Sequence, residues 1–220
     1  MTTIVIGSIP AEEFALHHTL ESIPGVSFEC ERIIESGDDA ILPLLWVRNA
    51  GDDLLERAFE EDPSVGSVTQ LAAFEDERFY RMDWIRHVRL LLQMLTHSDA
   101  TILDAYGRDG EWRLRVLFPT RDSFSGTHDF CHDHGLTFDI ESIRDMEGEP
   151  SGRYGLTDAQ YRALVEAVRR GYYDVPREET LEEIAEALDV SHQALSERLR
   201  RGTKSLIEDT LLVGLPPDFN

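Results

Sequence analysis

The side chains best placed for chemistry lie on one stretch that carries hydrogen-bond donors, acceptors and positive charges at helical spacing. These candidate site residues are Ser191, His192, Gln193, Ser196, Glu197, Arg198, Arg200, Arg201 and Lys204. Most of the basic residues after Arg177 fall between Arg198 and Lys204. A polar, partly basic helix face of this kind is typical of the second helix of a helix-turn-helix.

Two capped helices joined by a sharp turn would position this face. Thr180 can cap the first helix, and Glu183, three residues later, completes a capping box. Ser191 can cap the second helix. Apolar residues at helical spacing predict the buried sides, with Leu181, Ile184, Ala185 and Leu188 on the first helix and Leu195, Leu199 and Leu206 on the second. Ala185 is small where two crossing helices would come closest.

A second group of side chains could bind a metal ion. His128, Cys131, His132 and His134 lie within seven residues, and on a helix the first three would share a face. Imidazole and thiolate groups are ligands of transition metals. However, the spacing matches no closed zinc site, and the alternative is a helix end whose histidines complement the helix dipole around a packed Cys131. No cofactor is expected, and a metal ion or a small-molecule effector is left open.

The usual enzyme motifs are missing from the sequence. A P-loop requires a Gly-Lys pair, and the sole lysine, Lys204, follows a threonine. The sequence has no GxGxxG fingerprint and no GxSxG elbow. We therefore expect no enzymatic activity.

Charge sets the chain apart from an average globular protein. The 220 residues carry a net charge of −22, and all the basic residues except Lys204 are arginine. An acidic surface with almost no lysine favours a protein adapted to high salt, which screens self-repulsion beyond about 3 Å at 1 M. The alternative is an ordinary acidic cytosolic protein. No apolar run approaches the ~18 residues of a membrane span, and the N-terminus lacks the basic region of a secretory signal. A cytoplasmic location without a membrane partner is expected.

Residues before position 145 alternate between strand and helix patterns in mixed order. Strands are expected at 3–8, 26–34, 42–48, 65–81, 100–106, 112–118 and 136–143, and helices at 10–20, 52–60, 85–95 and 121–134. This order favours an α+β sandwich in which helices cover one face of a sheet. Two ferredoxin-like units, the first ending near residue 80, would fit.

A polar segment rich in Gly and Pro separates the two parts of the chain. We expect an α+β sensory or interaction domain at 1–148, a linker at 149–154 and an all-α helix-turn-helix domain at 155–215. The last domain would begin with a helix that Thr157 and Gln160 cap and Gly171 ends. Its apolar stripe is predicted at Tyr161, Leu164, Val165 and Val168.

The C-terminal part resembles the bacterio-opsin activator type of helix-turn-helix found in haloarchaeal regulators. The residues that carry the resemblance are GLTDAQ (155–160), GYYDVPRE (171–178), LEEIAEALDVS (181–191) and ALSERLRRG (194–202). The preceding region is similar to the domain that often accompanies it, on LPLLWVR (42–48), ATILDAYGRDGEWRLRVLFPTRD (100–122) and FCHDHGLTFDIESI (130–143). In the turn, Asp189 stands where many such units have glycine, and aspartate tolerates a positive φ better than most residues.

The resemblance implies a transcription regulator that binds double-stranded DNA. It places His192, Gln193, Ser196, Glu197 and Arg200 against base edges, and Arg198, Arg201 and Lys204 against phosphates. A homodimer is expected, and RNA polymerase or other regulators are further candidate partners. Two alternatives remain: an adaptor that docks the transcription machinery without reading bases, and a metal- or metabolite-binding sensor.

Overall fold

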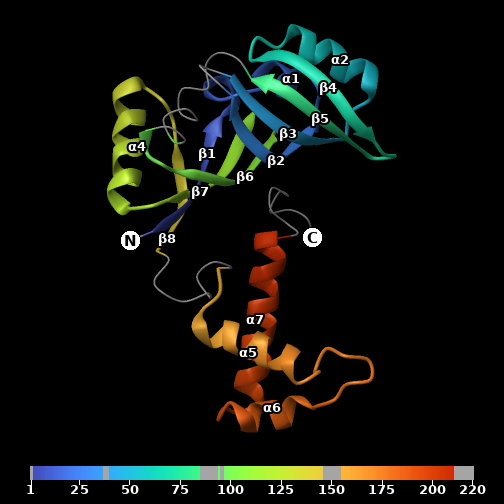
Figure 1. Ribbon diagram of the computed structural model, residues 1–220, viewed down its shortest axis with the longest axis vertical. Helices are drawn as coiled ribbons and strands as arrows, with labels where there is room; N and C mark the ends of the chain where they lie inside the picture. Colours follow the sequence, from blue (N-terminus) through green and yellow to red (C-terminus); the bar gives the residue numbers. More distant parts are fainter. Residues whose placement is uncertain (1, 37–39, 85–93, 95–96, 146–154, 211–220) are drawn as a thin grey trace. The chain divides into compact units, whose positions relative to one another are not determined.

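The computed structural model describes residues 2–36, 40–84, 94, 97–145 and 155–210, and the chain forms two compact units, Met1–Asp145 and Met146–Asn220 (Figure 1). The expected linker at 149–154 lies outside these ranges. The expected helix at 85–95 also lies outside them, except for residue 94.

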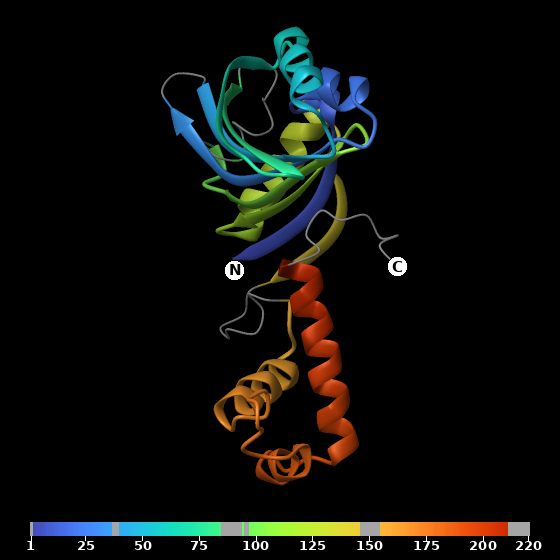
Figure 2. The ribbon, with the colours of Figure 1, turned by 90° about the vertical axis from the view of Figure 1, so that its right-hand side faces the viewer.

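The first unit is built on one antiparallel eight-stranded sheet in the order β4-β5-β3-β2-β6-β7-β1-β8. Its strands are β1 (Thr3–Pro10), β2 (Ser27–Ser36), β3 (Ala40–Arg48), β4 (Val65–Ala73), β5 (Glu77–Trp84), β6 (Thr101–Arg108), β7 (Glu111–Phe118) and β8 (Asp139–Asp145). The helical segments of this unit are η1 (Ala11–Glu13), α1 (His17–Ser22), α2 (Asp52–Glu61) and α4 (Arg121–His134). The sheet is strongly curled, as two views of the ribbon show (Figures 1 and 2).

The first strand of the chain lies far from the strand that follows it. β1 pairs with β7 on one side and with β8 on the other, whereas β2 pairs with β3 and β6. The strands β6-β7-β1-β8 therefore have the order of a split βαβ unit, with β2 to β5 inserted between its first and second strands. The α+β class is confirmed, but the division into successive units near residue 80 is wrong, because β1 completes the later half.

Three large aromatic side chains form the centre of the core. Phe14, Trp84 and Trp112 contact one another with ring centroids 5.3 to 5.6 Å apart, in the tilted and edge-on geometries that aromatic rings favour. All three are almost completely buried. The indole Nε1 of Trp112 donates to the backbone oxygen of Ala15 at 2.7 Å, which satisfies its one polar atom.

Helices cover one face of the sheet. Trp112, Leu114, Val116 and Phe118 of β7 are fully buried on this face, and α1, α2 and α4 supply the other side of the core. On the opposite face Arg113 and Arg115 pair with Glu141 and Asp104 at 2.9 and 3.3 Å. This alternation gives a sandwich of one sheet and one helical layer, as the sequence predicted.

The segment after β1 is not the continuous helix expected at 10–20. It forms the short η1, then an irregular turn in which Leu16 has a left-handed φ of 58°, and only then α1. Leu16 N–H donates to Ser64 Oγ at 2.8 Å, so a long-range contact replaces a helical hydrogen bond. Asp62 likewise caps the start of α1, because its carboxylate accepts from the N–H and the hydroxyl of Thr19.

Over its described residues, 155–210, the second unit contains three helices, α5 (Asp158–Arg169), α6 (Leu181–Ala187) and α7 (His192–Thr210). Their shared core consists of Ala163, Ala167, Ile184, Ala185, Leu195 and Leu199. The stripe predicted on α5 was therefore displaced: Ala163 and Ala167 are fully buried, whereas Val168 is 64 % exposed. Small residues lie innermost because α5 passes close to α7.

Candidate nucleic-acid interface

The turn between α6 and α7 ends the first helix with a left-handed residue. Asp189 has a φ of 52°, and its N–H donates to the oxygen of Glu186 at 3.1 Å. Val190 N–H then reaches back to the oxygen of Ala185 at 3.0 Å. These two bonds are those of a Schellman motif, which stops α6 and turns the chain sharply. The tolerance of Asp189 for positive φ, inferred from the sequence, is confirmed.

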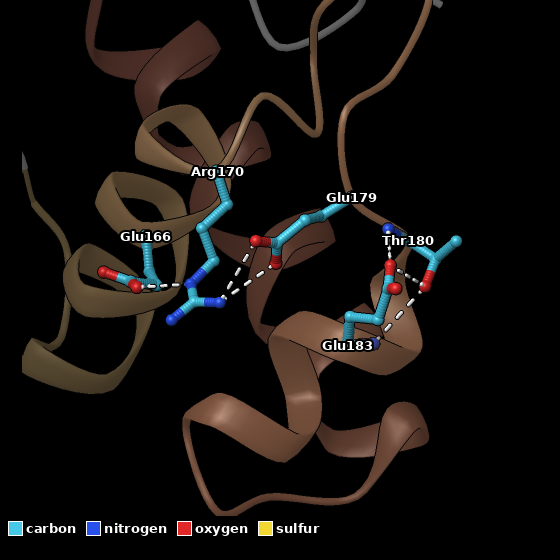
Figure 3. Close-up of polar contacts among 5 residues, drawn as sticks. All are labelled: Glu166, Arg170, Glu179, Thr180 and Glu183. Carbon is cyan, nitrogen blue, oxygen red and sulfur yellow. Dashed lines mark hydrogen bonds and ion pairs between the residues drawn. The ribbon is translucent and has the colours of Figure 1, made fainter.

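Capping side chains fix where both helices begin. Ser191 Oγ accepts from Ala194 N–H at 3.1 Å at the start of α7. At the start of α6, Thr180 Oγ1 accepts from Glu183 N–H at 3.3 Å while Glu183 Oε2 accepts from Thr180 N–H at 2.7 Å (Figure 3). Both predicted caps are therefore confirmed, and so is the box of Thr157 with Gln160 on α5. The hydrogen bonds from Thr180 lower the pKa of Glu183, because they favour its charged form.

An ion-pair clamp joins the end of α5 to the entry of α6. The guanidinium of Arg170 contacts Glu166 Oε1 at 2.6 Å and Glu179 Oε2 at 3.0 Å (Figure 3). The hydrogen bonds to Glu166 and Glu179 raise the pKa of Arg170. The spacing of Glu166 and Arg170 is a helical i, i+4 signal, but nothing local in the sequence indicates that Glu179 joins them.

The candidate residues on α7 fall into three groups. Gln193, Glu197, Arg200, Arg201 and Lys204 recur at the spacing of one helix face, opposite the buried Leu195, Leu199 and Gly202. Ser196 adjoins this face and is half-buried, while His192 and Arg198 stand on its flanks. Ser191 lies at the turn, where its hydroxyl is used as a cap. The face containing Gln193, Glu197, Arg200, Arg201 and Lys204 is called the α7 face from here on.

Charges on the α7 face are partly paired within the helix. Glu197 lies 3.5 Å from Arg201 and accepts from Gln193 Nε2 at 3.5 Å, and Lys204 lies 3.4 Å from Glu208. These contacts are long, and the side chains of Arg201 and Lys204 remain more than 70 % exposed. Such exposed pairs contribute little energy and can exchange their partner for a phosphate. Arg200 is exposed and has no carboxylate in ion-pair range among the residues that the structure describes.

Gly202 is a residue of this site that sequence reasoning missed. It is buried on α7, and a Cβ at this position would lie 2.8 Å from Leu164 Cδ1 and 3.3 Å from Gln160 Cβ on α5. The close approach lets α5 support α7 directly behind the exposed face. A glycine inside a helical pattern was the available signal, because it often marks a close approach.

The metal-binding hypothesis concerns α4 in the first unit. His128 and His132 are exposed, whereas Cys131 is buried and its burial raises the thiol pKa to about 11. His134 stacks on Phe130 with ring centroids 3.9 Å apart. Within the described part of the chain, no three His, Cys, Asp or Glu side chains are grouped to hold a metal ion.

Across the described ranges, none of the helices combines the length and the apolar composition that a membrane span requires.

Comparison with known proteins agrees with this arrangement. Residues 156–208 match the family described as "HTH DNA binding domain", and residues 9–154 match the "GAF and HTH_10 associated domain". The chain is 30 % identical over 171 residues to the dimethyl sulfoxide reductase transcriptional activator of Haloferax volcanii, covering 77 % of this chain and 67 % of that protein. The haloarchaeal source of this relative agrees with the acidic, lysine-poor composition. The chain therefore belongs to the bacterio-opsin activator family of DNA-binding transcription regulators.

Proposed function

We propose that α7 enters the major groove of double-stranded DNA and presents the α7 face to base edges and phosphates. The observation that carries this proposal is the exposure of Gln193, Arg200 and Arg201 on the side of α7 opposite its packing against α5 and α6. Arginine and glutamine make the bidentate contacts that distinguish guanine and adenine. The Schellman motif before α7 and the Ser191 cap fix where this helix begins. The ion pairs of Arg170 hold α5 and α6 together, so α7 keeps one orientation relative to them.

Within the site, the side chains have two tasks. His192, Gln193, Ser196, Glu197 and Arg200 are assigned to base edges, with Glu197 able to accept from the amino group of cytosine. Arg198, Arg201 and Lys204 are assigned to phosphates. Ser191 acts mainly on the helix itself, because its hydroxyl accepts from Ala194 N–H.

Binding in molar salt has to rely on short-range contacts. A chain with a net charge of −22 is repelled by DNA at long range, and concentrated salt removes most of the free energy of counterion release. Affinity should therefore come from hydrogen bonds to bases and from apolar surface that binding removes from water, rather than from net charge. For folded protein, a steep loss of affinity between low and molar KCl would contradict this.

The first unit is assigned to signal sensing or to dimerisation. The relative from Haloferax volcanii is an activator, and we propose that this chain likewise regulates transcription in the cytoplasm, in response to a signal received by the sheet domain. RNA polymerase or other regulators are candidate partners for that step.

A genome-wide footprint combined with transcript measurements after gene deletion tests the proposal. We expect discrete protected sites next to the genes whose transcripts change. Gln193→Ala and Arg200→Ala should weaken the footprints and relax their sequence preference, whereas Arg169→Ala, an exposed change on α5, should leave them unchanged. Random occupancy that neither Gln193→Ala nor Arg200→Ala alters would favour the adaptor alternative and overturn base reading.

A further inference from the structure

The sheet of the first unit has two edge strands, β4 and β8, and they differ sharply in charge. β4 reads VGSVTQLAA and contains no charged residue, in a chain of which 29 % is Asp, Glu, Lys or Arg. β8 reads DIESIRD and carries Asp139, Glu141, Arg144 and Asp145. Natural proteins commonly protect an edge strand with charge, because its outward N–H and C=O groups can pair with another strand. β8 carries such charges, whereas β4 has none and shows only two irregularities in its pairing with β5.

Apolar side chains lie exposed along and beside β4. Leu71 on the strand is 47 % exposed, and Phe74, one residue beyond its end, is 56 % exposed. Phe74 contacts the ring of Trp46, which stacks on Phe79 with centroids 4.4 Å apart. An uncharged edge therefore continues into an aromatic cluster on the same part of the sheet.

The backbone of β4 is regular at its centre. Its pairing with β5 shifts register between Val65 and Val68 and again between Gln70 and Ala72. Between these irregularities, Val68, Thr69 and Gln70 pair with successive residues of β5. Thr69 is the middle residue of β4. A two-fold axis beside Thr69 would therefore align the β4 strands of two copies over their whole length, with the two Thr69 residues opposite each other.

We infer that β4 is a homodimer interface, at which a second copy of this chain adds its own β4 in antiparallel orientation to extend the sheet. In molar salt the repulsion between two copies that each carry a charge of −22 is screened beyond about 3 Å, but like charges brought to contact distance in an interface still oppose association. β4 is an uncharged strip at which two copies can make close contact without placing like charges together. A basic partner protein would instead be attracted to the acidic surface elsewhere. Pairing of β4 with itself satisfies the edge groups of both copies and buries Leu71 and Phe74.

Such a dimer would supply the two-fold symmetry that paired DNA half-sites require, but it forms without DNA and is measured without it. Loss of DNA binding in an intact dimer would count against the α7 assignment alone. Conversely, a monomeric chain that still reads DNA would overturn the β4 interface alone.

Sedimentation of the full chain in molar KCl provides the first test. The wild-type chain should sediment as a dimer, and Leu71→Asp should weaken association on the order of a hundredfold, because it places an unpaired carboxylate in the interface. Ile143→Asp on β8 is the matched control, since Ile143 is 43 % exposed on the other edge strand, and it should leave the dimer intact. Far-UV circular dichroism should show that both variants are folded.

Oxidative cross-linking provides the second test and does not depend on weakening the dimer. Thr69→Cys should form a disulfide-linked dimer, because Cα atoms of directly opposite residues in antiparallel strands lie about 4.5–5.5 Å apart, within disulfide range. Ile143→Cys should not cross-link. Cys131 is buried and Cys30 is partly buried, and burial raises the pKa of both thiols, so the native thiols should react far more slowly than a thiol introduced at the exposed position 69. A monomeric wild-type chain, or a dimer in which Thr69→Cys fails to cross-link, overturns the inference.

Discussion

Gly202 of α7 lies so close to Leu164 of α5 that any larger residue at position 202 would have to move its neighbour. A Cβ there would stand 2.8 Å from Leu164 Cδ1, whereas a Cβ at Gly126 in α4 would meet nothing within 4 Å. The two glycines are both helical and differ in their surroundings. The contact shows how α5 sets the position of the helix that carries the α7 face.

Gly202→Leu should therefore destabilise the second unit by about 1–3 kcal/mol through overpacking against α5. Gly126→Leu should be neutral or stabilising by up to about 1 kcal/mol, because a helical glycine is replaced by a better helix former. Urea unfolding followed by far-UV circular dichroism would measure the first change. Tryptophan fluorescence would measure the second, since Trp46, Trp84 and Trp112 all lie in the first unit. Equal effects at the two glycines would contradict the close approach.

The capping box of α6 should make the second unit sensitive to acid. Glu183 has a lowered pKa in the folded state, so its contribution is present above the unfolded pKa of 4.5 and is lost as pH falls through the lower folded pKa. Glu183→Gln keeps the capping geometry without the titrating charge. Between pH 7 and the acid limit of folding, the variant should lose less stability than the wild-type chain. Parallel pH curves for the two would show that the carboxylate is not coupled to folding.

Asp189 offers a test of the turn itself. Glycine adopts its φ of 52° without the steric cost of a side chain, so Asp189→Gly should stabilise the second unit by up to about 1 kcal/mol. Asp189→Val should destabilise it by about 1–2 kcal/mol, because a β-branched residue is strongly disfavoured there. Thermal unfolding followed by circular dichroism would rank the three proteins. If valine were tolerated as well as glycine, the left-handed turn would be in doubt.

Local signals in the sequence predicted the second unit better than the first. Thr157, Thr180 and Ser191 cap helices through residues three positions away, so their roles can be read from short windows. The placement of β1 between β7 and β8 depends on contacts more than a hundred residues apart, which periodicity does not report. The helix predicted at 10–20 was wrong for the same reason. Ser64 and Trp112, which are distant in sequence, form hydrogen bonds with the backbone of this segment.

The polar face of the candidate site could be predicted from the sequence, whereas the packing of α5 behind α7 could not. The spacing of Gln193, Arg200 and Lys204 follows from 3.6 residues per turn and needs no tertiary knowledge. By contrast, the role of Ala163 and Ala167 as the innermost residues of α5 depends on how closely α7 passes. Hydrophobicity alone favoured Val168, which the structure leaves largely exposed.

Glu197 should restrain non-specific DNA binding. Its carboxylate lies among the polar side chains of the α7 face, 3.5 Å from Arg201, and would repel phosphate. Glu197→Gln keeps the shape and removes the charge, so we expect several-fold tighter binding to unrelated DNA at low salt and a weaker preference for the cognate sequence. Fluorescence anisotropy with cognate and scrambled duplexes would measure both. Glu186→Gln, an exposed change on α6, should have little effect.

Selection of binding sites from a random duplex library in molar KCl tests base reading by α7 most directly. The wild-type chain and Arg169→Ala should enrich the same sequence motif. Arg200→Ala should weaken binding to that motif by about 1–3 kcal/mol and lose preference at one base position. A library from which the wild-type chain enriches no motif, or a motif that Arg200→Ala and Gln193→Ala both leave unchanged, would contradict the assignment of α7 as the recognition helix.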